Sequence, residues 1–122
     1  MPGLPTGRTV VLNGKGFNFS VASTGIELMR GLSGVTDLGP YHGMLFDFGC
    51  DFKAIMHPRG LKIDIEVAFI TSEGEIVEIG SLLQDMYPNF LLYAPVPVRY
   101  VLEVPVGFFE QNSLKVGDKI NL

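Results

Sequence analysis

Residues 43–79 read GMLFDFGCDFKAIMHPRGLKIDIEVAFITSEGEIVEI and decide the fold of this protein. Apolar and polar residues alternate along the stretch, β-branched residues are frequent, and Gly, Pro and a Ser-Glu-Gly turn interrupt the runs. An alternation with a period of two is typical of β-strands that bury one face. Residues 62–71 are the clearest case. We expect one face of this strand to be buried against an earlier strand, through Ile63, Ile65, Val67, Phe69, Met44, Phe46 and Phe48.

Shorter strand-like runs flank this stretch on both sides. Thr24 and Glu27 have the spacing of a capping box, so a short helix is predicted over residues 24–32, and one helical turn is predicted over 107–112. Many short strands and little helix favour a mainly β fold, a single compact antiparallel sandwich or barrel-like domain over 8–122. Residues 1–7, with two Pro and two Gly, are expected to form an extended arm. The other strands are expected at 8–12, 17–21, 44–48, 52–57, 75–80, 89–93, 98–104 and 119–122.

The composition narrows the class of protein. A chain of 122 residues with 47% hydrophobic and 18% charged residues is long and apolar enough for one folded domain. The formal net charge is −4 and the nine Lys and Arg are scattered, so we expect no nucleic-acid partner. No apolar run approaches the roughly 18 residues of a membrane span, so no membrane partner is expected. The first ten residues lack the features of a signal peptide, which predicts a cytoplasmic or particle-associated protein. Cys50 is the single cysteine, so no intrachain disulfide is possible.

Five short motifs, in order, resemble those of a known family. The segment 43–48, GMLFDF, is similar to a GMLF-x-F strand, and 74–79, GEIVEI, is similar to the return strand of a hairpin. The others are Gly31-Leu32, 100–107 (YVLEVPVG) and 114–120 (LKVGDKI). Over residues 17–122 the chain resembles the DUF192 family, a domain of unknown function. The resemblance implies a compact, β-rich, sandwich-like domain and carries no catalytic residue with it.

The resemblance also indicates where this chain departs from the family. Members tend to show W-M-x-N-T-x-I-P-L-D before the long strand, whereas residues 55–64 here read IMHPRGLKID. If that region forms a pocket in the family, this chain has altered it. Many members carry a secretion signal, which this sequence does not show.

Two carboxylates on one strand are the strongest candidates for a chemical site. Asp64 and Glu66 are two residues apart, so their side chains would lie about 7 Å apart on one face. That spacing suits an acid–base pair or two ligands of a hard cation. A solvated strand face beside Lys62 explains the same pattern. We expect no catalytic residue, no metal and no cofactor, and the candidate pocket residues are Met44, Met56, His57, Asp64 and Glu66.

A second candidate is a surface for protein contacts. Residues 86–98 are aromatic, rich in Pro and poor in charge, as the centres of protein interfaces are. We therefore expect a non-enzymatic binding or assembly module that self-associates or docks on a larger structure, as a homo-oligomer or in a larger protein assembly. The alternative is a small-ligand- or metal-binding domain, or a minor enzyme, with a pocket around Asp64 and Glu66. The candidate interface residues are Leu4, Pro5, Tyr87, Phe90, Leu92, Tyr93, Pro95 and Pro97.

Overall fold

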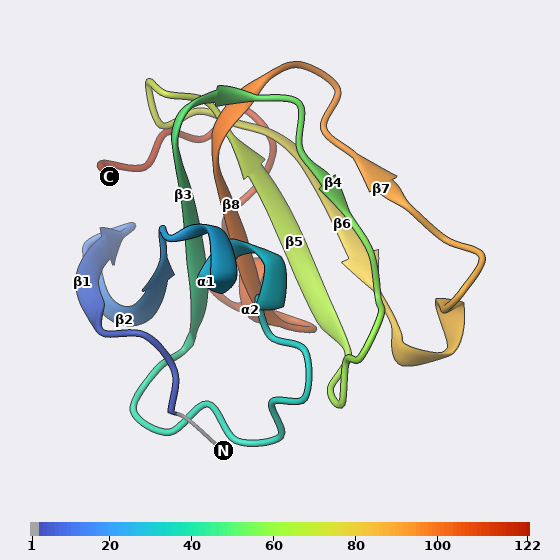
Figure 1. Ribbon diagram of the computed structural model, residues 1–122. Coiled ribbons are helices and arrows are strands. Elements are labelled where there is room, and N and C mark those ends of the chain that lie inside the picture. Colours follow the sequence, from blue (N-terminus) through green and yellow to red (C-terminus); the bar gives the residue numbers. More distant parts are fainter. Residues whose placement is uncertain (1–2) are drawn as a thin grey trace.

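The structure is a computed structural model that describes residues 3–122 (Figure 1). It confirms a mainly β, compact small domain with two short α-helices. The strands are β1 Gly7–Leu12, β2 Lys15–Ala22, β3 Gly43–Phe52, β4 Ile55–Met56, β5 Ile65–Ile70, β6 Ile76–Leu82, β7 Leu92–Tyr93 and β8 Val98–Pro105. The helices are α1 Gly25–Arg30, the single 3-10 turn η1 Gln84–Met86, and α2 Phe108–Gln111.

The main sheet has six strands in the order β1-β2-β3-β8-β5-β6, and β4 and β7 form a separate two-stranded ribbon. All neighbours in the main sheet are antiparallel except β2 and β3, which run parallel. The sheet is therefore mixed and does not close into a barrel, which corrects the purely antiparallel arrangement expected from the sequence. The reason lies in the connection: α1 and the loop 31–42 carry the chain back to the starting end of β2, as a parallel pair requires.

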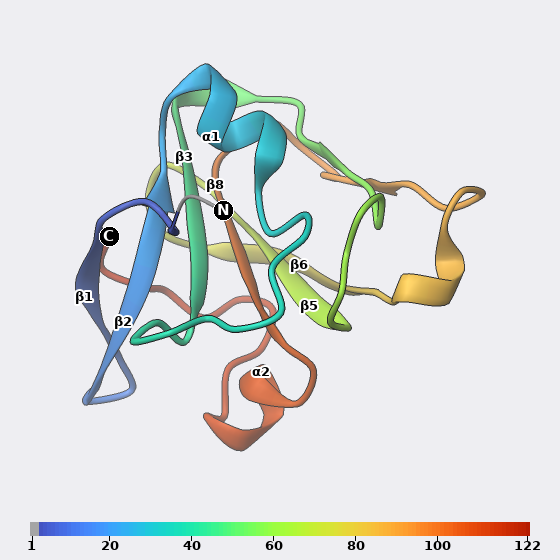
Figure 2. The ribbon, with the colours of Figure 1, turned by 60° about the horizontal axis from the view of Figure 1, so that its bottom comes forward.

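Apolar side chains cover both faces of this sheet, in two clusters. On one face, Phe108 and Phe109 of α2 pack with Phe17 and Phe19 of β2. On the other face, Leu32 after α1 packs with residues of β3, β5 and β8. In Figure 2, α1 lies at the top of the molecule and α2 at the bottom.

The expected core is confirmed on the α1 face. Met44, Phe46, Ile65, Val67 and Phe69 are all buried there in one cluster, with Phe48 and Ile63 partly buried against it. Ala68 and Ile70, which the alternation assigns to the opposite side of β5, are also buried, in the other cluster. The strand β5 lies between β8 and β6, and apolar side chains cover both of its faces. Glu66 is therefore the last polar residue of the strand, and residues 67–70 are all buried.

Several strand boundaries differ from those expected. β3 continues to Phe52, with an irregular register against β8 between Asp47 and Phe52, so residues 44–48 and 52 form one bent strand. β4 and β7 have two residues each, β5 begins at Ile65, and the C-terminal strand is reduced to one bridge between Glu75 and Lys119. In β4, β5, β7 and the C-terminal segment, the predicted strand is longer than the run of residues that pair with a neighbour.

Local signals place α1 as expected. The Glu27 backbone N–H donates to Thr24 Oγ1 at 3.2 Å, and Glu27 Oε1 accepts from the Thr24 N–H at 3.1 Å. Glu27 Oε1 also accepts from the Ser23 N–H at 3.1 Å. The hydrogen bonds from the Ser23 and Thr24 backbone N–H groups hold the pKa of Glu27 below its usual value. The helix ends at Gly31, whose φ of 51° and ψ of −131° lie in a region that side chains disfavour.

The described part of the N-terminal arm lies on its own domain. Ser20 Oγ donates to the Pro5 carbonyl at 2.6 Å, and the Val21 N–H donates to the Thr6 carbonyl at 3.3 Å. Leu4 packs partly buried against the α1-face cluster, and Gly7 already belongs to β1. Residues 1–2 of the predicted arm lie outside the described residues.

Candidate functional site

A pocket of about 430 Å³ lies beside α1 on the face of the sheet that α1 covers. One wall comes from α1 and the turn after it, through Leu28, Met29 and Leu32. The rest of the lining comes from β3 and from β4 with the loop after it, and Glu103 of β8 is the buried charged residue in this lining. The sequence predicted α1, β3, β4 and β8 as separate elements. That these four elements line one pocket is decided by the tertiary structure.

Three phenylalanines of β3 form a row along this pocket. The ring centroids of Phe46 and Phe48 are 6.4 Å apart, and those of Phe48 and Phe52 are 4.8 Å apart and stacked. Phe46 is buried, Phe48 is partly buried, and Phe52 is 50% exposed, so the row runs from the core to solvent. It offers a graded aromatic surface on which an apolar ligand can lie.

Glu103 lies in the central strand β8, opposite Met44 of β3 and Val67 of β5. Its side chain therefore belongs to the α1 face, where both of these neighbours are part of the apolar cluster. The residue is 4% exposed, and its Oε1 has no hydrogen-bond partner within residues 3–122. Burial among apolar groups raises the pKa of Glu103 to about 8, because a charged carboxylate is poorly solvated there. At neutral pH this carboxyl group is therefore mostly protonated, and can both donate and accept a hydrogen bond.

Gly31 allows the carboxyl group of Glu103 to lie directly beside the end of α1. A Cβ atom built on Gly31 would lie 2.8 Å from Phe46 Cζ and 3.7 Å from Glu103 Oε1. A side chain at this position would therefore collide with the Phe46 ring and lie against the carboxyl oxygen. The Gly31-Leu32 pair of the sequence thus has a role at this pocket as well as at the helix end.

The mouth of the pocket carries positive charge. Arg30 of α1 and Arg59 of the loop after β4 both line it, together with His57. The ion pairs among the described residues are Asp47–Arg99 and Lys115–Asp118, so neither Arg30 nor Arg59 takes part in one. Glu103 is the only acidic residue among those that line the pocket.

Hydrogen bonds fix the mouth of the pocket. Ser33 Oγ, after α1, donates to the Arg59 carbonyl at 2.8 Å, and the Gly34 N–H donates to the Gly60 carbonyl at 2.7 Å. The Arg59 N–H donates to His57 Nδ1 at 3.2 Å, so this nitrogen acts as an acceptor. The two walls are thus tied together at the edge of the pocket.

The structure brings some of the predicted pocket residues to this site and not others. Met56 and His57 line the pocket. Met44 lines a neighbouring hollow of about 270 Å³ beside Leu4 and Pro5. Asp64 and Glu66 line neither pocket.

The carboxylates of Asp64 and Glu66 accept hydrogen bonds from backbone N–H groups. Asp64 Oδ1 accepts from the Gln84 N–H at 2.8 Å, at the start of η1, and Glu66 Oε1 accepts from the Gly107 N–H at 2.9 Å, just before α2. No group of three or more His, Cys, Asp or Glu that could hold a metal ion occurs in residues 3–122.

Sequence reasoning did not select Glu103, Arg30 or Arg59. A signal for Glu103 exists, because a single acidic residue interrupts the apolar run YVLEVPV at 100–106. Acidic residues are rarely buried without a partner, so an acidic residue in a run that is otherwise apolar is unusual and marks a candidate site residue. The two arginines carry no comparable signal, since they are far apart in the sequence and meet only in the folded chain.

The candidate interface residues occupy the stretch around β7. Tyr87 and Tyr93 are 48% and 53% exposed, and Pro95 and Pro97 are exposed as well. Phe90 and Leu92 are partly buried against the α1-face cluster, so the stretch is anchored by these two side chains. Figure 1 shows that the chain from β6 to β8 extends away from the main sheet at one side of the molecule. A role of these residues in assembly stays a prediction.

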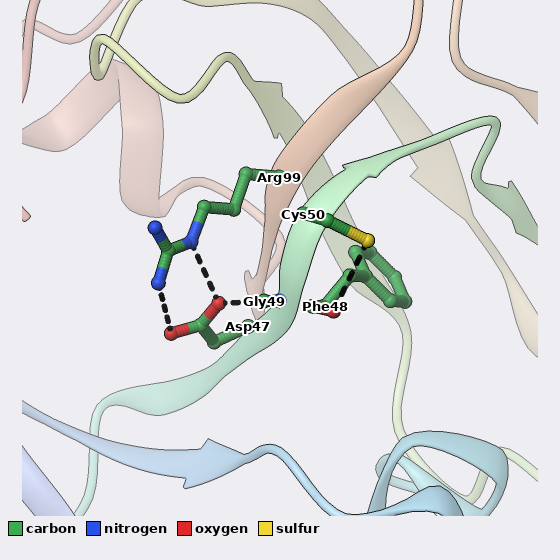
Figure 3. Close-up of polar contacts among 5 residues, drawn as sticks. All are labelled: Asp47, Phe48, Gly49, Cys50 and Arg99. Carbon is green, nitrogen blue, oxygen red and sulfur yellow. Dashed lines mark hydrogen bonds and ion pairs between the residues drawn. The ribbon is translucent and has the colours of Figure 1, made fainter.

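A further polar group braces the bend in β3 (Figure 3). Arg99 Nε donates to Asp47 Oδ1 at 3.0 Å, Arg99 Nη2 donates to Asp47 Oδ2 at 3.4 Å, and the Gly49 N–H donates to Asp47 Oδ1 at 2.8 Å. Burial alone would raise the pKa of Asp47, but the hydrogen bonds from Arg99 and Gly49 and the charge of Arg99 outweigh it and hold the pKa below its usual value. Cys50 is exposed beside this pair, with its Sγ 3.8 Å from the Phe48 carbonyl oxygen.

Comparisons with known proteins agree on the family and the fold. The family model DUF192, described as an uncharacterized ACR, matches residues 8–122. A UPF0127 protein of Pyrococcus abyssi is 31% identical over 84 residues, which cover 66% of this chain and 68% of that protein.

Two solved structures resemble the whole domain. A candidate transcription regulator from Sinorhizobium meliloti 1021 aligns with a TM-score of 0.84 and 23% identity, over 99% of this chain and 96% of that one. A protein of unknown function from Novosphingobium aromaticivorans aligns with a TM-score of 0.78 and 26% identity, over 93% and 82%. The helices of residues 3–122 are all too short or too polar to span a membrane.

Proposed function

This chain belongs to the DUF192 family, and we propose that it is a small-molecule-binding domain whose ligand lies in the pocket beside Glu103. The observation that carries the proposal is the buried carboxyl group of Glu103, whose Oε1 has no hydrogen-bond partner within residues 3–122, in the lining of a mostly apolar pocket. Such a group lowers the stability of the fold by about 1–3 kcal/mol when its hydrogen bond is not made. A ligand with a polar atom beside this carboxyl group would hydrogen-bond to it.

The size and lining of the pocket support the same proposal. A volume of about 430 Å³ falls within the range of small-molecule sites, about 300–1,000 Å³. Such sites combine a mostly apolar lining with a few polar groups that orient the ligand. Here the apolar part is the row of Phe46, Phe48 and Phe52, and the orienting groups are Glu103 and the charged residues of the mouth.

This proposal replaces the pocket around Asp64 and Glu66 with one around Glu103. Both of those carboxylates already accept backbone hydrogen bonds, whereas Glu103 Oε1 accepts none. Of these three carboxyl groups, the one in the pocket lining is that of Glu103 in β8.

A neutral fluorescent dye, N-phenyl-1-naphthylamine, tests the proposal. We expect its emission to increase on binding to the wild-type chain, because it moves from water into an aromatic pocket. The Leu28→Trp variant, which fills the pocket from α1, should lose this increase. The matched control is Val116→Trp, at a 54% exposed position that does not line the pocket, and it should keep the increase.

The dye experiment has a clear contrary outcome. If Leu28→Trp folds, as judged by circular dichroism, and binds the dye as well as the wild type does, the dye lies elsewhere and this pocket is not the binding site. An absence of dye binding to the wild-type chain would also contradict a preformed apolar site.

A second candidate function is the assembly module expected from the sequence. The observation that favours it is the run of exposed apolar side chains on the projecting stretch around β7, namely Tyr87, Leu91, Tyr93 and Val96. Light scattering of the wild type and of the Tyr93→Ala variant tests it. A wild-type mass above that of one chain, lowered by the substitution, would support assembly through this stretch, and a single-chain mass at high concentration would refute self-association.

A further inference from the structure

The mouth of the Glu103 pocket differs in charge from the rest of the protein. The chain has thirteen acidic and nine basic residues, and a net charge of −4. Yet the residues that line the pocket include Arg30 and Arg59, and Glu103 is the one acid among them. Neither arginine belongs to an ion pair within residues 3–122.

We infer, on the basis of the proposed function, that the ligand is an amphipathic anion, with an apolar body on the phenylalanine row and an acidic group at the mouth between Arg30 and Arg59. Guanidinium groups bind carboxylates and other oxyanions through charge-assisted, often bidentate hydrogen bonds. Arg30 belongs to α1 and Arg59 to the loop after β4, and both line the pocket. An anion bound by both arginines would therefore link these two elements.

The polarity along the pocket gives the ligand a direction. Phe52 and Arg59 are exposed and mark the outer end, Arg30 is half-buried, and Phe46 and Glu103, both nearly fully buried, mark the inner end. A protonated carboxyl group at the inner end makes hydrogen bonds with a neutral polar atom, such as a carbonyl or hydroxyl oxygen. The ligand thus presents its acid outward and a neutral polar group inward.

A cationic ligand fits the same residues less well. Its charge would have to pass or face two arginines at the mouth. At the inner end it would need the carboxylate form of Glu103, which burial disfavours. The choice between an anionic and a cationic ligand is therefore one that a matched series of probes can decide.

The test uses 4-phenylbutanoate, 4-phenylbutan-1-ol and 4-phenylbutylamine, which share one apolar body and differ in charge. Each is titrated against the full chain loaded with N-phenyl-1-naphthylamine, and displacement of the dye gives its affinity. We expect the carboxylate to bind at least about tenfold more tightly than the alcohol, and the amine most weakly. Added salt should weaken the carboxylate most, since its advantage is electrostatic.

Variants assign the preference to the mouth. Arg30→Gln and Arg59→Gln should each weaken binding of the carboxylate about three- to tenfold and leave the alcohol unchanged. Arg8→Gln is the matched control, because it removes the same charge from an exposed position that does not line the pocket. It should leave the preference intact.

The outcomes separate this inference from the proposed function. Equal displacement by all three probes, or tightest binding by the amine, would overturn the anionic ligand while leaving a small-molecule site in place. A carboxylate preference that survives both arginine substitutions would overturn the role of the mouth. If neither the dye nor any of the probes binds the wild-type chain, the inference fails together with the function on which it rests.

Discussion

Glu103 should make the protein less stable as the pH rises from 5 to 7.5, and Glu103→Gln should remove that dependence. In the unfolded chain this carboxyl group releases its proton near its ordinary pKa of 4.5, whereas in the folded chain burial raises the pKa to about 8. Between these two values the unfolded state carries fewer protons than the folded state. The free energy of unfolding therefore falls with pH by up to about 1.4 kcal/mol per pH unit.

The magnitude follows from the two pKa values. Below pH 4.5 both states are protonated and Glu103 contributes no pH dependence, and above pH 8 both are ionised and the loss is complete. Integrated from pH 5 to pH 7.5, the loss is about 3 kcal/mol. Other groups act in a different range: the pKa values of Asp47 and Asp118 are lowered from 3.8, so the stability they contribute is lost only as the pH falls through that acidic region.

The assay is urea unfolding of the wild type and of Glu103→Gln at pH 5.0, 6.0, 7.0 and 7.5, at constant ionic strength. The difference between the two proteins at each pH cancels the other ionisable groups, and also cancels the pH-independent cost of burying a polar side chain at this position. Glu78→Gln, at an exposed position of β6, removes the same carboxylate from the unfolded chain and controls for that change. A wild-type minus Glu103→Gln difference that stays constant within about 0.5 kcal/mol over this range would refute the buried, unpartnered state of Glu103.

Three further predictions concern the fold. Phe69→Ala removes a fully buried ring and should lower the free energy of unfolding by about 3–5 kcal/mol in urea; a loss below about 1 kcal/mol would mean that this face of β5 is not the core. Thr24→Ala removes the capping-box acceptor of α1 and should cost about 1 kcal/mol by the same measurement, whereas an unchanged midpoint would show that α1 needs no cap. Gly31→Ala places a Cβ atom 2.8 Å from the Phe46 ring at a positive φ, so it should lower the melting temperature and weaken dye binding, and wild-type behaviour in both would contradict the close contact.

The elements of this fold were largely predictable because their signals are local. The alternation from Ile63 to Phe69 predicted a strand and its buried face, and Thr24 with Glu27 predicted the start of α1. Asn13 and Gly14 lie between the first two strands, and both have the positive φ angles that a hairpin turn of this kind needs. Each of these signals depends on residues within about one turn of helix or one strand of each other.

The candidate site depended on contacts that no local pattern records. Asp64 lies just before β5 and Glu66 within it, and their carboxylates accept hydrogen bonds from backbone N–H groups of residues 20 and 41 positions later. Glu103 is buried because Met44 and Val67 come to lie on either side of it when β8 enters between β3 and β5. Strand order is set by hydrogen bonds and packing between segments that are far apart in the chain. The burial of each side chain follows from that order, so both were decided by the tertiary structure alone.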